Sequence, residues 1–109
     1  MDTPHHSALV LDDPRDYLHW RAGSGGTFEI WDICVGSERR KGKGRQLVSR
    51  MLANLPPTAT VWAITRADNE IAQQFYEALG FKVLGVLRSF YGPHGVDAVM
   101  YGRKAGGVV

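Results

Sequence analysis

Two amphipathic segments in the middle of the chain limit its fold more than any other feature. Apolar residues recur at helical spacing between Lys43 and Leu55, and Pro56-Pro57 ends that segment. The second segment has a candidate N-cap at Asp68 or Asn69 and a candidate C-cap at Gly80. The sequence therefore predicts two helices, with buried stripes formed by Leu47, Val48, Met51, Leu52 and Leu55 in the first and by Ile71, Ala72, Phe75 and Leu79 in the second.

Segments typical of β-strands lie on both sides of the helices. Ser7 to Leu11 and Tyr17 to Arg21 flank a run of turn-forming residues and predict a hairpin. Thr27 to Val35 is rich in β-branched and aromatic residues, which predicts a mostly buried strand. Further strands are expected at Thr60 to Thr65, Phe81 to Leu87 and Val96 to Arg103. Because hairpins cluster at both ends and crossovers lie between them, we expect a mixed α/β (α+β) fold with a mostly antiparallel sheet.

Length and composition favour a single domain that covers residues 1–109. Of these residues, 44% are hydrophobic and 22% are charged, as in ordinary globular proteins. No apolar run approaches the roughly 20 residues of a membrane helix, and no secretory signal is visible, so a cytoplasmic location without a membrane partner is expected. The only cysteine, Cys34, excludes an intramolecular disulfide, and the four histidines are scattered, so no metal site is expected.

Positive charge is concentrated in one short segment. Residues 38–50 hold six bases and one acid, although the formal net charge of the chain is only +2. Gly42 and Gly44 allow close approach of a ligand to the backbone, and the following helix offers its first N–H groups and the positive end of its dipole. The segment is therefore either a site for a phosphorylated ligand or a solvated basic turn. It matches neither a P-loop nor the Rossmann fingerprint.

Two ordered motifs then point to a known family. The first is Arg39-x-x-Gly42-x-Gly44, which resembles the acetyl-coenzyme A pyrophosphate loop of the GNAT superfamily of N-acetyltransferases. The second is Asn69-x-x-Ala72-x-x-Phe75-Tyr76-x-x-x-Gly80-Phe81, which resembles a later motif of that family on the second helix. The closing segments are similar to the ribosomal-protein alanine N-acetyltransferase type. The resemblance covers roughly Thr27 to Arg103 and implies a GNAT-like fold without the usual N-terminal strand and helices.

The resemblance implies an activity and a cofactor site. Acetyl would pass from acetyl-CoA to a primary amine, of a peptide or protein terminus or of a small molecule, by direct attack. The pantetheine arm of coenzyme A would bind along the strand before the loop. The implied cofactor-binding residues are Ile33, Cys34 and Val35 on that strand, Arg39, Arg40, Lys41, Gly42, Lys43 and Gly44 in the loop, and Asn69, Phe75 and Tyr76 in the second motif.

The resemblance also implies catalytic residues. Tyr76 matches the tyrosine that family members commonly use as the general acid toward the coenzyme A thiolate, with Tyr91 as a weaker substitute. Similar members carry a glutamate as base where this chain has Ile64. The base is therefore left open between Asp32, Glu29 and a water relay.

The two carboxylates differ in their expected surroundings. Under strict alternation Asp32 shares a face with apolar residues, where desolvation raises its pKa, whereas Glu29 lies on the other face. A bulge would exchange these assignments. Each carboxylate is alternatively an exposed acid or a partner of Arg21 or Arg66.

Other functions remain as alternatives. The chain is alternatively a coenzyme A-binding module that has lost catalysis, because Ile64 replaces the glutamate. A nucleic-acid-binding protein is a third alternative, which the low net charge and the absence of aromatics among the bases disfavour. Without the usual N-terminal elements one sheet face lacks its cover, which predicts a homodimer and an open acceptor site that favours a peptide or protein amine.

Overall fold

The computed structural model describes residues 6–36 and 42–106 and consists of one six-stranded sheet and two helices. The elements are β1 (His6–Val10), β2 (Asp16–Ala22), β3 (Thr27–Val35), α1 (Lys43–Ala53), β4 (Thr60–Arg66), α2 (Glu70–Ala78), β5 (Lys82–Leu87) and β6 (Ala98–Lys104). The strand order is β1-β2-β3-β4-β6-β5, in which only β3 and β4 are parallel neighbours. The predicted fold class is thus confirmed.

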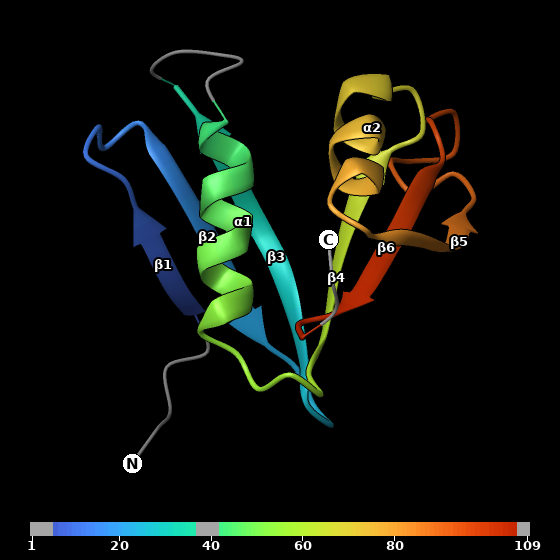
Figure 1. The fold of residues 1–109 in the computed structure, drawn as a ribbon. Coiled ribbons are helices and arrows are strands. Elements are labelled where there is room, and N and C mark those ends of the chain that lie inside the picture. The colour runs from blue at the N-terminus through green and yellow to red at the C-terminus, as the bar shows by residue number, and fades with distance from the viewer. Residues whose placement is uncertain (1–5, 37–41, 107–109) are drawn as a thin grey trace.

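Both helices lie on the same face of the sheet, as Figure 1 shows. Helix α1 covers β1, β2 and β3, and α2 lies over β4 and β6. No helix in the described part of the chain is long and apolar enough to cross a membrane.

Helix α1 packs against the sheet through the stripe that its sequence predicts. Leu47, Val48 and Met51 are fully buried, and Leu52 is nearly so. They join a core to which β2 contributes Leu18 and other strands contribute Ile30, Val61 and Tyr101 among others. Burial of each large apolar side chain stabilises the fold by about 1.5–3 kcal/mol, so this stripe holds α1 in place.

Helix α2 buries different side chains from those that its sequence predicts. Asn69 is the N-cap, as expected, and Gly80 follows the last turn with a φ of 85°. However, Ile71 is 79% exposed, so its place in the predicted buried stripe is wrong. Tyr76 is buried instead, because it lies four residues after Ala72 and three before Leu79 and so shares their helical face.

Strand β3 is also less buried than its composition suggests. Only Ile30 among its residues is buried, and Trp31 is 53% exposed, so the prediction of a mostly buried strand is wrong. The reason is that the helices cover one face of β3 only (Figure 1).

The pairing of β3 with β4 is short. Their parallel register covers Thr27–Glu29 opposite Thr60–Trp62, and beyond these residues the two strands diverge (Figure 1). From Ile30 onward no strand of the described chain pairs with β3 on its β4 side. The main-chain groups on that edge are therefore open to a ligand.

Candidate functional site

A cleft of ≈ 320 Å³ opens where β3 and β4 diverge. Strand β3 forms one wall, and β4 and α2 form the other. The cleft is lined by Ile30, Trp31, Asp32 and Ile33 of β3, Ile64, Thr65 and Arg66 of β4, and Asn69, Ala72, Phe75 and Tyr76 at α2. It therefore brings together Ile33, Asp32, Asn69, Phe75 and Tyr76, which the sequence singled out.

The first turn of α1 borders a second, larger cavity of ≈ 630 Å³. Gly42 begins the helix in the left-handed conformation, with a φ of 72°, and no side chain of the described residues caps it. The first turn of α1 also contains no acidic residue. The cavity is lined by Val35, Gly42, Lys43, Gly44, Arg45, Ile71, Gln74 and Phe75. Such a helix start is suited to an anion, because its N–H groups and dipole favour negative charge.

Three predicted ligands of the phosphate lie outside the described residues. They are Arg39, Arg40 and Lys41.

Phe75 lines both the cleft and the cavity and connects them. A Cβ atom added at Gly44 would lie 2.9 and 3.1 Å from two ring atoms of Phe75. A side chain at position 44 would therefore displace the ring of Phe75, and glycine lets the start of α1 approach α2 without this shift. This contact gives a physical reason why the two sequence motifs occur together.

Tyr76 lies in an aromatic cluster at the base of the cleft. Its ring centroid lies 5.2 Å from those of Phe75 and Phe81 and 6.0 Å from that of Tyr101. Only 5% of the residue is exposed, and burial raises the pKa of its phenol to about 12. The phenol therefore keeps its proton at neutral pH and can donate it to a group in the cleft.

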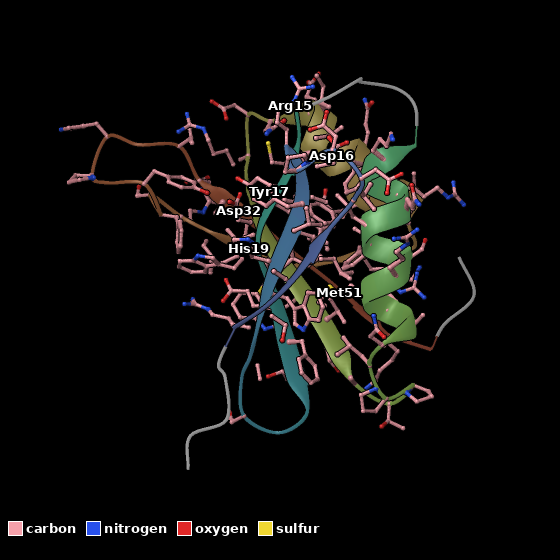
Figure 2. All side chains as sticks on the ribbon, turned by 90° about the vertical axis from the view of Figure 1, so that its left-hand side faces the viewer. Arg15, Asp16, Tyr17, His19, Asp32 and Met51 are labelled. Atoms are coloured by element: carbon pink, nitrogen blue, oxygen red, sulfur yellow. The ribbon has the colours of Figure 1, made fainter. Side chains whose placement is uncertain are left out.

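A bulge at Trp31 decides which way the acids of β3 face. Asp32 pairs with His19 whereas Ile30 pairs with Trp20, so Trp31 is the extra residue in the ladder. Asp32 consequently lies on the face opposite α1 and is exposed, and its expected place among apolar side chains is wrong. Figure 2 shows Asp32 beside Tyr17 and His19 on that face. The negative charge of Asp32 and a hydrogen bond to it raise the pKa of Tyr17.

Glu29 is engaged in an ion pair. Its Oε1 accepts a hydrogen bond from Nε of Arg21 at 2.7 Å, and its side chain is 13% exposed. The guanidinium of Arg21 also lies 3.6 Å from the ring centroid of Trp31. Glu29 is thus the partner of Arg21, one of the alternatives that the sequence allowed, and Asp32 is the acid of β3 that lines the cleft.

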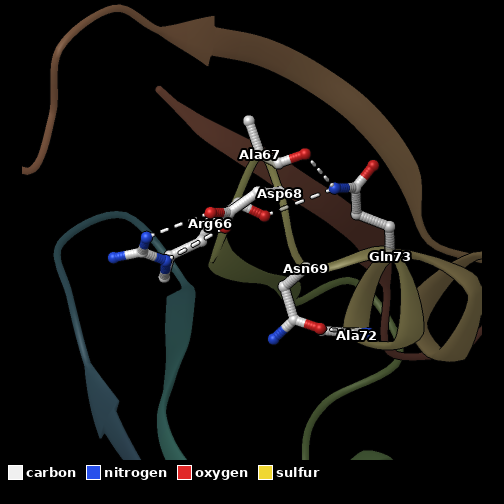
Figure 3. Close-up of polar contacts among 6 residues, drawn as sticks. All are labelled: Arg66, Ala67, Asp68, Asn69, Ala72 and Gln73. Carbon is white, nitrogen blue, oxygen red and sulfur yellow. Dashed lines mark hydrogen bonds and ion pairs between the residues drawn. The ribbon is translucent and has the colours of Figure 1, made fainter. Parts of the chain in front are cut away.

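The turn between β4 and α2 fixes the rim of the cleft (Figure 3). Arg66 Nε donates to Asp68 Oδ1 at 3.0 Å, and the side-chain amide of Gln73 donates to the carbonyl of Ala67 at 2.8 Å. Asn69 Oδ1 accepts a hydrogen bond from the Ala72 N–H at 3.0 Å. Arg66 also lies 5.3 Å from the ring centroid of Tyr91, which brings Tyr91 next to the cleft without lining it.

Comparison with known proteins identifies this architecture. The sequence model of the acetyltransferase (GNAT) family matches residues 8–81, which is more than half of the chain. The chain belongs to the GNAT acetyltransferase family. No curated protein gives a significant sequence match.

Several solved structures have the same fold. A GNAT-family protein from Desulfovibrio desulfuricans superposes with a TM-score of 0.81 and 24% identity over 93% of this chain and 70% of the other. The ribosomal-protein-S18-alanine N-acetyltransferase of Escherichia coli gives 0.80 and 22% over 99% and 74%. An acetyltransferase from Bacillus subtilis, in complex with CoA, gives 0.77 and 18% over 92% and 77%.

Cys34 pairs with Tyr17, so its side chain shares the face of Tyr17 and lies away from the cleft lining, whereas its backbone belongs to the open edge of β3. No cluster of His, Cys, Asp or Glu in residues 6–36 and 42–106 is arranged to hold a metal ion.

Sequence reasoning did not place Thr65 or Arg66 in the cleft. For Thr65 the available signal was its position, since it is the only hydroxyl on the face of β4 that otherwise carries Val61 and Ala63.

Proposed function

We propose that the protein is an N-acetyltransferase that transfers acetyl from acetyl-CoA to a primary amine of a peptide, a protein or a small molecule. The observation that carries this proposal is the cleft between the diverging strands β3 and β4, which continues past Phe75 to the uncapped start of α1. An elongated ligand with a phosphorylated end matches both parts. Coenzyme A has this shape, and it is the ligand of the Bacillus subtilis relative.

The two parts of coenzyme A would be held in different ways. The amides of its pantetheine arm would hydrogen-bond to the open main-chain edge of β3 at Ile33, Cys34 and Val35, as an added strand does. Its pyrophosphate would lie against the first turn of α1 at Gly42, Lys43 and Gly44. We assign the counter-charge beyond these residues to Arg39, Arg40 and Lys41. Asn69 and Phe75 would complete the wall of the cleft on α2.

The reaction needs two proton transfers around one displacement. The amine nitrogen forms a bond to the thioester carbonyl carbon, and the carbon–sulfur bond breaks with its electron pair on sulfur. Tyr76, which is kept protonated by burial, gives its proton to that sulfur. Asp32 takes the proton from the ammonium, directly or through water, and a main-chain N–H of Ile33 to Val35 polarises the carbonyl.

Asp32 is the better candidate base of the two acids on β3. It lines the cleft and is exposed to an incoming amine, whereas Glu29 is held by Arg21. An α-amine, with a pKa near 8, needs less help from a base than a lysine does.

The alternative function is a coenzyme A-binding module without catalysis. It is favoured by Ile64, an apolar residue that lines the cleft at the position where the family resemblance implies a glutamate base. Binding alone does not separate the two functions, so turnover must be measured.

Thermal shift tests the proposed function first. Coenzyme A and acetyl-CoA should each raise the melting temperature, and ATP at equal concentration should raise it much less, because ATP lacks the pantetheine arm. Release of free thiol on addition of peptides with free N-termini should then report acetyl transfer. Equal stabilisation by ATP would contradict the cofactor assignment, and binding without thiol release over a broad panel of amines would favour the binding module.

We also propose that the chain forms a homodimer through the sheet face that the helices leave uncovered. Trp31 and Leu84 are each more than half exposed. Sedimentation at micromolar concentration should give twice the chain mass of 12.1 kDa, and a mass of one chain would contradict the dimer.

A further inference from the structure

One buried hydroxyl in the cleft has no partner in the protein. Thr65 lies on β4 on the same face as Val61 and Ala63 and is only 6% exposed. Among the described residues, its Oγ1 is the one buried side-chain oxygen or nitrogen without a hydrogen-bond partner. Buried polar groups in folded proteins are nearly always paired, so this hydroxyl needs an explanation.

The unpaired hydroxyl costs stability that the chain could avoid. A buried donor or acceptor without a partner costs about 1–3 kcal/mol, and valine has nearly the same shape as threonine without this cost. The neighbouring positions on this face of β4 are apolar, as in an ordinary core strand. A hydroxyl at position 65 therefore indicates a partner that the folded chain alone does not supply.

The location of Thr65 indicates which partner this is. Thr65 lines the cleft together with Ala72 and Tyr76, opposite Ile33 on β3. It lies on the side of the sheet that carries both helices, and therefore on the side of the cavity at the start of α1. A ligand that extends from that cavity past Phe75 toward Tyr76 passes the hydroxyl.

We propose that the Thr65 hydroxyl is a binding residue for the pantetheine–thioester arm of acetyl-CoA, with an amide or the thioester carbonyl of that arm as its hydrogen-bond partner. This inference rests on the proposed function. The hydroxyl is both donor and acceptor, so it matches either group. Thr65 thus holds the arm from β4 while the main chain of β3 holds it from the other side.

Two substitutions separate this role from a structural one. Thr65→Val removes the hydroxyl and keeps the shape, and Thr65→Ser keeps the hydroxyl. Calorimetric titration should show that Thr65→Val weakens the binding of coenzyme A about tenfold and that Thr65→Ser stays within about twofold of the wild type. Binding of the phosphorylated ADP moiety of coenzyme A, which lacks the arm, should be the same in all three proteins.

A comparison of coenzyme A with acetyl-CoA identifies the partner group. An equal loss of affinity for both in Thr65→Val assigns an amide of the arm, and a loss confined to acetyl-CoA assigns the thioester carbonyl. The free Thr65→Val protein should melt at the wild-type temperature or above it, because no hydrogen bond within the protein is lost.

Three results would overturn the inference. The first is wild-type affinity for both ligands in Thr65→Val. The second is a loss of affinity for the phosphorylated ADP moiety in Thr65→Val that equals the loss for coenzyme A. The third is a free Thr65→Val protein that melts below the wild type while the free Thr65→Ser protein melts at the wild-type temperature. Failure of the wild-type protein to bind coenzyme A at all is a different result, which would overturn the proposed function itself.

Discussion

Helix α1 begins at Gly42 without a side-chain cap, whereas α2 begins at Asn69, whose side chain accepts a hydrogen bond from the Ala72 N–H. The first turn of α1 has no acidic residue, and that of α2 contains Glu70. The positive end of α2 is thus satisfied within the chain, and that of α1 is left for an anion. Under the proposed function, this difference separates two tasks: α1 would hold the phosphorylated end of the cofactor, and α2 would present Tyr76 to the reacting end.

The largest effect is expected at Tyr76, because this division assigns the chemistry to α2. Tyr76→Phe should lower kcat by about 100-fold or more, since a positioned general acid contributes about 10²–10⁴. The ring packing is kept, so the affinity for coenzyme A should stay within about twofold. Steady-state thiol release and calorimetry measure the two quantities. Loss of cofactor affinity with unchanged kcat would break the assignment.

The second effect concerns the acids of β3. Asp32→Asn should lower kcat/KM about tenfold to 100-fold, because it removes the proposed base. Glu29→Gln is the matched control, which should weaken the ion pair with Arg21 and lower the melting temperature with little change in rate. A large loss of kcat/KM in Glu29→Gln, with little loss in Asp32→Asn, would assign the base to Glu29.

A third variant gives α1 a side-chain N-cap like that of α2. Gly42→Asp places a carboxylate at the N-cap of α1 and should weaken coenzyme A binding about tenfold at low salt, because it occupies the N–H groups and repels the phosphates. Gly42→Asn is the control for backbone strain, since asparagine tolerates the left-handed conformation and carries no charge. Equal affinities of the two variants would mean that charge at this helix start is unimportant.

The converse change removes the cap of α2. Asn69→Ala should lower the stability by about 1 kcal/mol, the usual effect of an N-cap deletion, and should be detected by chemical denaturation. Because the cap also shapes the rim of the cleft, a modest rise in KM is expected. Unchanged stability would show that the start of α2 does not depend on its cap.

The smallest effect is expected in the ionisation of the Tyr76 phenol at high pH. The folded pKa of Tyr76 is raised from its ordinary value of 10.0 to about 12 by burial. The stability that this shift contributes is fully present below pH 10 and is lost as the pH rises toward 12. The difference in tyrosinate absorbance between the wild type and Tyr76→Phe should therefore grow mainly above pH 11. A difference centred near pH 10 would contradict the burial of the phenol.

The sequence predicts the parts of this molecule that depend on local spacing. Both helices, the Asn69 cap and the Gly80 stop follow from residues that are close along the chain. The mostly antiparallel order also follows, because strands that are consecutive in the sequence pair as neighbours at both ends of the sheet. The second motif singles out Tyr76, which lines the cleft, although the predicted buried stripe of this helix does not include it.

The features that the sequence does not predict depend on contacts between distant segments. The bulge at Trp31 arises in the pairing of β3 with β2, and this one extra residue moves Asp32 to the exposed face. Ile71 is apolar and correctly spaced, but it borders the cavity at α1 and is not covered by the sheet. The missing partner of Thr65 depends on every side chain around it.

Amide hydrogen exchange of β3 tests the central claim most directly. If the pantetheine arm of coenzyme A pairs with the open edge of this strand, saturating coenzyme A should slow exchange in the segment Ile33–Val35 at least tenfold and leave β1 unchanged. Coenzyme A that binds at saturation without any protection of this segment would contradict the claim.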